Sequence, residues 1–248
     1  MNSKWVNVLI NDKPVEAYLS MPDGQGPHPG IVVAMHVFGI DQFVQGKCDE
    51  LAQQGYIAIA PYLFHRSDVS NDQLTSYQFE DPQRRQVAMP LKDNLKDPEL
   101  IEDMLGALNY LKKMNNVNSS FGVTGFCIGG RIAYLMSVNT NEFEACADFY
   151  GVDIDLPWGE GNSPLSFTAN LNCKLAGFFG DLDQNPSKLD VDHFEAELKA
   201  KHKNYTFHRY SNAQHAFNDP YNPVRYDQEA SRDSWPKLIE FFDEALKN

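Results

Sequence analysis

The sequence predicts an α/β fold: a mostly parallel, doubly wound sheet with helices on both faces, opened by an N-terminal antiparallel hairpin. Short apolar runs alternate with segments of helical period along the chain, as in folds built from strand–helix–strand units. Several runs, such as GIVVAM at 30–35, are apolar throughout, which is typical of strands buried on both faces of a parallel sheet. With 248 residues and 42% hydrophobic content, the chain is expected to form one domain, 1–248, around one core.

The first half of the chain supplies the hairpin and the first crossovers. Runs 4–10 and 14–21 flank Asn11 and Asp12, two turn-forming residues, and therefore predict the hairpin. After the strand at 30–35, apolar residues at near-helical spacing predict a helix that stops at Gly55. The run YIAIAP at 56–61 is the next strand. An amphipathic helix is expected over 98–114, with Pro98 at its start and lysines at its end.

The second half continues the alternation. The expected strands are SFGVTGF (120–126), FEACADFYG (143–151), KLAGFFG (174–180) and YTFHRYS (205–211), and the expected helices cover about 129–138, 189–201 and 231–246. Two segments, about 61–97 and 151–172, are too long for ordinary connections and are rich in Pro, Asp, Asn and aromatic residues. Because both follow strand ends, they are expected to form pocket walls or lids.

Composition narrows the class of function. The net charge of −13 argues against nucleic-acid binding and against a polybasic membrane-binding surface. No stretch reaches the about 18 apolar residues of a membrane span, and the first 20 residues lack the pattern of a secretory signal. The cysteines are scattered, which favours reduced thiols over disulfides or a zinc site, and hence a cytoplasmic protein.

One cysteine stands in a pattern that predicts a nucleophile. In VTGFCIGG a strand runs into Cys127, with glycines two positions before and two after it, and a helical segment follows. This is the sequence pattern of a nucleophile elbow, whose tight turn displays the side chain at the carboxyl edge of the sheet. The start of the helix favours a thiolate, and the N–H of Ile128 would face a developing oxyanion. Cys48, Cys146 and Cys173 lie in or beside regular elements and are expected to be structural.

A nucleophile of this kind requires a base and a group that orients the base. In this type of fold the chain order is nucleophile, acid, histidine. Asp181 and Asp183 follow the strand 174–180, and Asp183 is preferred because it stands clear of the strand end, with Asp181 as the alternative. His215 follows the strand 205–211 and is the expected base. His36 and His65 also follow strand ends and remain candidates for the same site.

These residues resemble the dienelactone hydrolase family, cysteine hydrolases of the α/β-hydrolase fold. The resemblance covers nearly the whole chain and is carried by VVAMHVFGID, LAQQGYIAIAPYLF, GFCIGGR, GDLD and AQHAFND. It implies a catalytic triad of Cys127, Asp183 and His215. It also implies that the N–H of Val37 is the second oxyanion-hole donor, beside that of Ile128.

Two positions depart from the family pattern. The glutamate that holds the resting thiol in dienelactone-hydrolysing members is replaced by His36, which is expected to modulate the thiol or contact the substrate. The arginine that grips a substrate carboxylate shortly after the catalytic histidine is replaced by Asn218 and Asp219. A second family arginine is expected at Arg84 or Arg85. Because a carboxylate-binding group is missing, a neutral or differently shaped substrate is expected in place of dienelactone.

The expected function is therefore cysteine-dependent hydrolysis of a small ester, lactone or thioester through an acyl-enzyme, a carboxylesterase activity that needs no metal or other cofactor. The expected partner is the small-molecule substrate, with no nucleic acid or membrane, in a monomer or small homo-oligomer. Two other classes remain open: a non-catalytic ligand-binding or sensor protein on a hydrolase scaffold, and a redox-active thiol protein.

Overall fold

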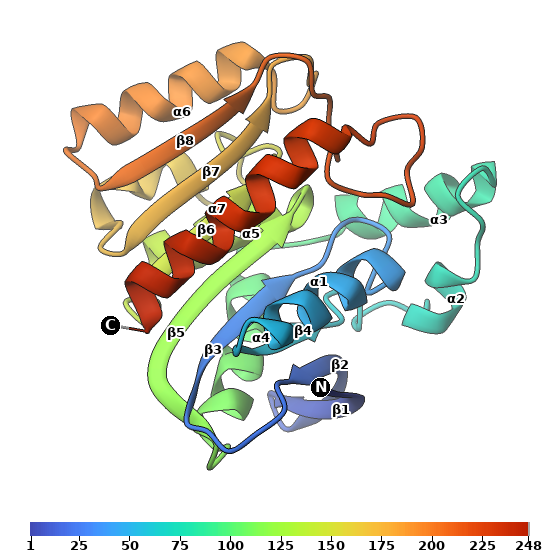
Figure 1. The fold of residues 1–248 in the computed structure, drawn as a ribbon. Coiled ribbons are helices and arrows are strands. Elements are labelled where there is room, and N and C mark those ends of the chain that lie inside the picture. The colour runs from blue at the N-terminus through green and yellow to red at the C-terminus, as the bar shows by residue number, and fades with distance from the viewer. Residues whose placement is uncertain (248) are drawn as a thin grey trace.

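The computed structural model describes residues 1–247 and contains one mixed eight-stranded sheet, with strand order β1-β2-β4-β3-β5-β6-β7-β8 (Figure 1). The strands are β1 (Asn2–Ile10), β2 (Lys13–Met21), β3 (His28–Ala34), β4 (Ile57–Pro61), β5 (Val117–Phe126), β6 (Ala145–Phe149), β7 (Lys174–Gly180) and β8 (Tyr205–Tyr210). The pairs β1–β2 and β2–β4 are antiparallel, and β3 to β8 run parallel to one another. The predicted α/β-hydrolase fold with its N-terminal hairpin is confirmed.

Helices cover both faces of the sheet. They are α1 (Gln42–Gln53), α2 (Asn71–Thr75), α3 (Pro82–Asp93), α4 (Asp97–Lys112), α5 (Ile128–Asn139), α6 (Lys188–Ala200) and α7 (Gln228–Leu246), with a 3₁₀ helix at Pro164–Asn170. Figure 1 shows α1 and α7 in front of the sheet and α4 and α5 behind it, and α4 contacts β1, β3, β4 and β5. This two-sided cover is the reason why the central strands are apolar on both faces.

The hairpin turn forms because of its residues. Asn11 and Asp12 have φ angles of 48° and 62°, the left-handed conformation that a two-residue turn between antiparallel strands requires. Asn and Asp tolerate this conformation better than other non-glycine residues. The register from Asn2 opposite Met21 to Ile10 opposite Lys13 then joins the two strands along their full length.

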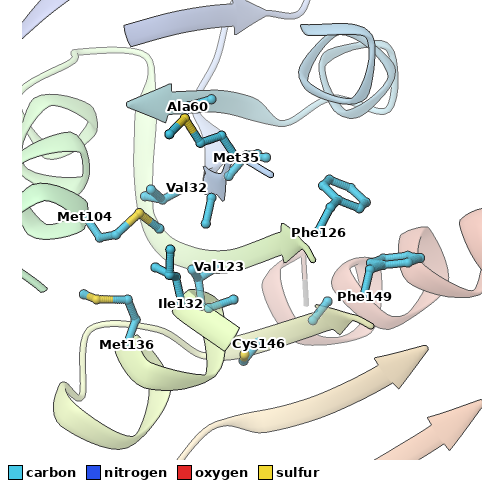
Figure 2. Packing of buried hydrophobic residues seen from close by; sticks show 14 of the residues in the cluster. Val32, Met35, Ala60, Met104, Val123, Phe126, Ile132, Met136, Cys146 and Phe149 are labelled. Carbon is cyan, nitrogen blue, oxygen red and sulfur yellow. The ribbon is translucent and has the colours of Figure 1, made fainter. Parts of the chain in front are cut away.

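The core lies between the sheet and its helices, and Figure 2 shows part of it. Met35 after β3, Ala60 on β4 and Val123 on β5 are fully buried, together with Met104 of α4 and Ile132 of α5. Cys146 of β6 packs in the same cluster, as a small apolar side chain.

The two long segments hold more regular structure than their composition indicates. Residues 61–97 contain α2 and α3, and 151–172 contains the 3₁₀ helix. Pro82 stands in the first turn of α3, where a missing N–H costs nothing, while Pro90 lies near its end. The high proline content therefore led to the prediction of a loop where α3 forms, a helix whose N-cap is Asp81. Within residues 1–247, no helix has the length and apolar character needed to cross a membrane.

Candidate active site

A cavity of about 340 Å³ lies at the carboxyl ends of the parallel strands. Cys127 and Ile128 line it, with residues from the turn after β3, from α3, from the loop after β7 and from the loop between β8 and α7. Figure 1 shows α3 and the loop that precedes α7 at the same end of the sheet. Open α/β sheets bind their ligands at this edge, so the cavity is the candidate active site.

Cys127 occupies a sharp turn between β5 and α5. Its φ of 62° and ψ of −119° are unfavourable for a residue with a Cβ, so the surrounding structure must hold it there. Its N–H donates a hydrogen bond to Phe149 O at 3.0 Å, and its carbonyl accepts one from Gly130 N at 3.1 Å. These bonds fix the turn from both sides and leave the thiol at the cavity wall.

The glycines around Cys127 allow this turn because the backbone segments pass too closely for side chains. A Cβ on Gly125 would lie 2.1 Å from Gly129 O, and a Cβ on Gly129 would lie 2.2 Å from Ala34 O. At Gly130 it would lie 2.1 Å from Asp148 Oδ1. The predicted elbow geometry at Cys127 is therefore present, with the close packing that its glycines indicate.

The loop after β7 separates the two candidate acids. Asp183 is 5% exposed, and its Oδ2 lies 2.7 Å from His215 Nδ1. Its other oxygen, Oδ1, accepts a hydrogen bond from Asn185 N at 2.9 Å. Asp181 forms ion pairs with Arg209 at 3.2 Å and Lys188 at 3.5 Å instead. The structure thus brings Asp183, rather than Asp181, to the histidine.

The charges of Cys127 and His215 favour an ion pair. Burial raises the pKa of a thiol, but at Cys127 the charge of His215, a hydrogen bond with it and the charge of His36 bring the pKa below its usual value. Burial lowers the pKa of an imidazole, yet at His215 the Cys127 thiolate and Asp183 raise it to about 10. A thiolate beside an imidazolium is therefore the favoured state.

The other three cysteines have the opposite electrostatics. Burial raises the pKa of the Cys48 and Cys146 thiols, and it raises that of Cys173 to about 12. These thiols lie in or against the core, so each stays protonated and unreactive at neutral pH.

The structure places the remaining predicted residues as follows. Val37, His36, Arg84 and Arg85 all line the cavity. Arg84 Nη2 is ion-paired with Asp41 Oδ2 at 3.0 Å, whereas Arg85 is exposed and has no ion-pair partner among residues 1–247. Arg84 is therefore held by the protein's own carboxylate.

His65 and Asn218 belong elsewhere. His65 Nε2 lies 3.1 Å from the buried carboxylate of Asp103, which Arg66 also binds through two hydrogen bonds. Asn218 is buried and accepts a hydrogen bond from the Tyr150 hydroxyl. Neither His65 nor Asn218 lines the cavity.

Several cavity residues were not singled out from the sequence. They include Phe38, Met89, Lys92, Asn222 and Arg225. Met89 and Lys92 lie on α3, a helix that the sequence reading missed, and Arg225 lies ten residues beyond His215 on an irregular loop. No local pattern marks such positions. Within residues 1–247, no group of His, Cys, Asp and Glu side chains is arranged to hold a metal ion.

Comparison with known proteins places the chain in a family. A model of the dienelactone hydrolase family matches residues 15–246. A protein of Methylorubrum extorquens named "Putative carboxymethylenebutenolidase" is 30% identical over 240 residues, covering 96% of this chain and 79% of that protein. A protein of the same name from Synechocystis sp. is 29% identical, covering 94% of this chain and 93% of the other.

A solved structure agrees over the whole length. The crystal structure of a protein named "Putative Dienelactone Hydrolase" from Klebsiella pneumoniae matches with a TM-score of 0.86 and 24% identity, covering 98% of each chain. At 24% identity, this similarity supports the fold alone. The family model and the curated relatives carry the assignment further: this chain belongs to the dienelactone hydrolase family, and it is a hydrolase of that family.

Proposed function

We propose that the protein is a cysteine-dependent hydrolase that cleaves a small, uncharged ester, lactone or thioester through an acyl-enzyme. The observation that carries this proposal is the arrangement at the cavity wall: Cys127 stands on the elbow and lines the same cavity as His215, whose Nδ1 is 2.7 Å from Asp183 Oδ2. A nucleophile, a base and an orienting carboxylate on three separate loops are the requirements of acyl transfer.

The reaction proceeds in two halves. The Cys127 thiolate attacks the substrate carbonyl, and the N–H groups of Ile128 and Val37 stabilise the tetrahedral oxyanion. His215, as the imidazolium, gives its proton to the leaving group as the carbon–oxygen or carbon–sulfur bond breaks. The neutral imidazole then takes a proton from water, which attacks the thioester carbonyl and releases the acid and the thiolate. Asp183 orients His215 throughout.

The charges around the cavity support an uncharged substrate. Arg84 is bound to Asp41 and Lys92 to Asp153 at 2.9 Å, so both cations are already neutralised. Asp219, 6% exposed, adds a carboxylate to the cavity wall. Arg85 and Arg225 are exposed, and water screens their charges. The segments 61–97 and 151–172 contribute walls through α3 and through Val152 and Asp153.

The decisive experiment compares the protein with the variant Cys127→Ala on a panel of neutral and anionic esters, lactones and thioesters. The wild-type protein is expected to hydrolyse the neutral compounds, and the variant to lose at least about a thousandfold in kcat while keeping its unfolding transition. Mass spectrometry during turnover should detect an acyl group on Cys127. Equal turnover by both proteins would remove the cysteine from the reaction. No turnover of any compound by the wild type would favour a non-catalytic protein.

A further inference from the structure

A second histidine reaches the candidate active site from a different part of the sheet. His36 follows β3 and begins a tight turn, in which Gly39 N donates to His36 O at 3.1 Å and Gly39 has a φ of 83°. The residue is 7% exposed and lines the cavity with Cys127. Its imidazole is therefore withdrawn from solvent and shares the cavity with the thiol, whose pKa its charge lowers.

This histidine is paired with a carboxylate. His36 Nε2 lies 2.9 Å from Asp41 Oδ1, and both side chains are about nine-tenths buried. Asp41 was not among the residues expected from the sequence. It is the N-cap of α1, and its Oδ1 also accepts hydrogen bonds from Phe43 N and Val44 N. The start of a helix favours a negative charge, so the carboxylate is held in its ionised form.

A cation fixes the other oxygen of the same carboxylate. Arg84 Nη2 of α3 lies 3.0 Å from Asp41 Oδ2, and its guanidinium stacks on the Phe38 ring at 3.9 Å. Phe38 belongs to the turn that carries His36 and Val37. Asp41 thus accepts hydrogen bonds from its own helix and from α3 and forms an ion pair with His36, which leaves the carboxylate little freedom to turn away.

The remaining charges around His36 act in the same direction. Its neighbours are the carboxylates of Asp41 and Asp219 and the thiol of Cys127. Burial lowers the pKa of the His36 imidazole, but these negative groups outweigh burial and raise it above its usual value. Burial raises the pKa of the Asp41 carboxyl, but His36, the Val44 amide and Arg84 together outweigh burial and bring this pKa below its usual value.

We propose that Asp41 is a positioning residue that keeps His36 as an imidazolium beside Cys127, so that the nucleophile rests as a thiolate between two positively charged histidines. This inference deepens the function proposed above and depends on it. In this arrangement the thiol is ionised before any substrate binds. No charge on the substrate is needed to generate the nucleophile, which suits an uncharged ester.

The experiment measures how readily the free enzyme is alkylated at Cys127, using iodoacetamide across a range of pH and mass spectrometry of the modified residue. The test variant is Asp41→Asn, because asparagine is as good an N-cap as aspartate and removes only the charge. Without the carboxylate, His36 loses its proton near neutral pH and the thiol pKa rises. A rise of one pKa unit slows alkylation about tenfold below the midpoint and leaves the rate at high pH unchanged.

The matched control is Asp227→Asn. Asp227 is the N-cap of α7, where its side chain accepts a hydrogen bond from Ala230 N, and it does not line the cavity. This control should leave the alkylation profile unchanged. A variant that only loosened the fold would change the rate at high pH or the unfolding transition, but not the midpoint of the profile.

A double-mutant cycle tests whether Asp41 acts through His36. His36→Gln should shift the profile in the same direction as Asp41→Asn, and the double variant should shift it no further than His36→Gln alone. Additive shifts, or an Asp41→Asn profile that coincides with the wild type, would overturn the proposal. The proposed function fails on a different result: it is overturned if Cys127→Ala and Cys127→Ser both keep the ester turnover of the wild type. The two failures can be told apart because alkylation is measured without substrate.

Discussion

Asp183 Oδ2 lies 2.7 Å from His215 Nδ1, whereas Asp181, two residues earlier on the same loop, is paired with Arg209 and Lys188. Asp183 N donates to Gly180 O at 3.2 Å, so the chain turns directly after β7. This turn separates the two carboxylates and assigns them different partners. The pair therefore provides an internal control for the proposed mechanism.

We expect Asp183→Asn to reduce kcat by about 10³- to 10⁴-fold on a neutral ester, because an amide cannot stabilise the imidazolium or select its tautomer. Asp181→Asn should change kcat less than about threefold, since it loses only two partly exposed ion pairs away from the cavity. Steady-state kinetics on both variants make the comparison. If the two variants lost activity equally, Asp183 would not be the orienting acid.

We expect substrate charge preference to depend on Asp219. Replacing it by asparagine removes a negative charge from the cavity wall, so kcat/KM for an anionic ester should rise about fivefold relative to that for its neutral analogue, or ~1 kcal/mol. The ratio of the two substrates is the proper measure, because any effect of Asp219 on His36 acts on both. A ratio equal to that of the wild type would mean that the acyl group does not approach Asp219.

We expect the elbow glycines to tolerate no side chain. Gly129→Ala places a Cβ 2.2 Å from Ala34 O, a backbone atom of β3, so the free energy of unfolding should fall by about 3 kcal/mol or more. The control is Gly46→Ala in α1, where a Cβ meets no atom within 4 Å and should stabilise the protein by about 0.5–1 kcal/mol. Urea denaturation of both variants measures the difference, and a Gly129→Ala protein of unchanged stability would contradict the elbow geometry.

We expect stability to fall with rising pH because of Asp148, which lies fully buried at the end of β6. Burial raises its pKa to about 7, although Gly151 N donates to its Oδ1 at 2.7 Å and opposes the shift. Below the unfolded-state pKa of about 4 this carboxyl is protonated in both states. Between that value and pH 7 the folded state binds one more proton than the unfolded state. The stability that this proton contributes therefore falls as pH rises from about 4 and is lost as pH passes through about 7.

The size of this effect follows from the shift. About three pKa units correspond to about 4 kcal/mol of unfolding free energy, fully lost above pH 7. Urea denaturation at a series of pH values should show this decrease in the wild type and a flatter profile in Asp148→Asn. Parallel profiles would mean that Asp148 is ionised in the folded protein at low pH.

Much of the fold could be predicted from local sequence. Strands such as 30–35 and 56–61 are apolar throughout because a parallel sheet buries both of their faces, and this pattern can be recognised from the sequence. The hairpin could be predicted from Asn11 and Asp12. In contrast, α3 was missed because Pro82 and Pro90 resemble loop residues, although a proline in the first turn is compatible with a helix.

For the candidate site, the sequence by itself determined the elbow at Cys127, because its glycines encode a close approach of backbone segments that no other residue permits. It also determined the order of the proposed nucleophile, acid and base along the chain. Only the tertiary structure decided that Asp183 and not Asp181 meets His215, that Arg84 is bound by Asp41, and that Asp219 faces the cavity. The physical reason is that ion pairs join side chains from different loops, whose separation in space is set by the sheet and not by spacing in the sequence.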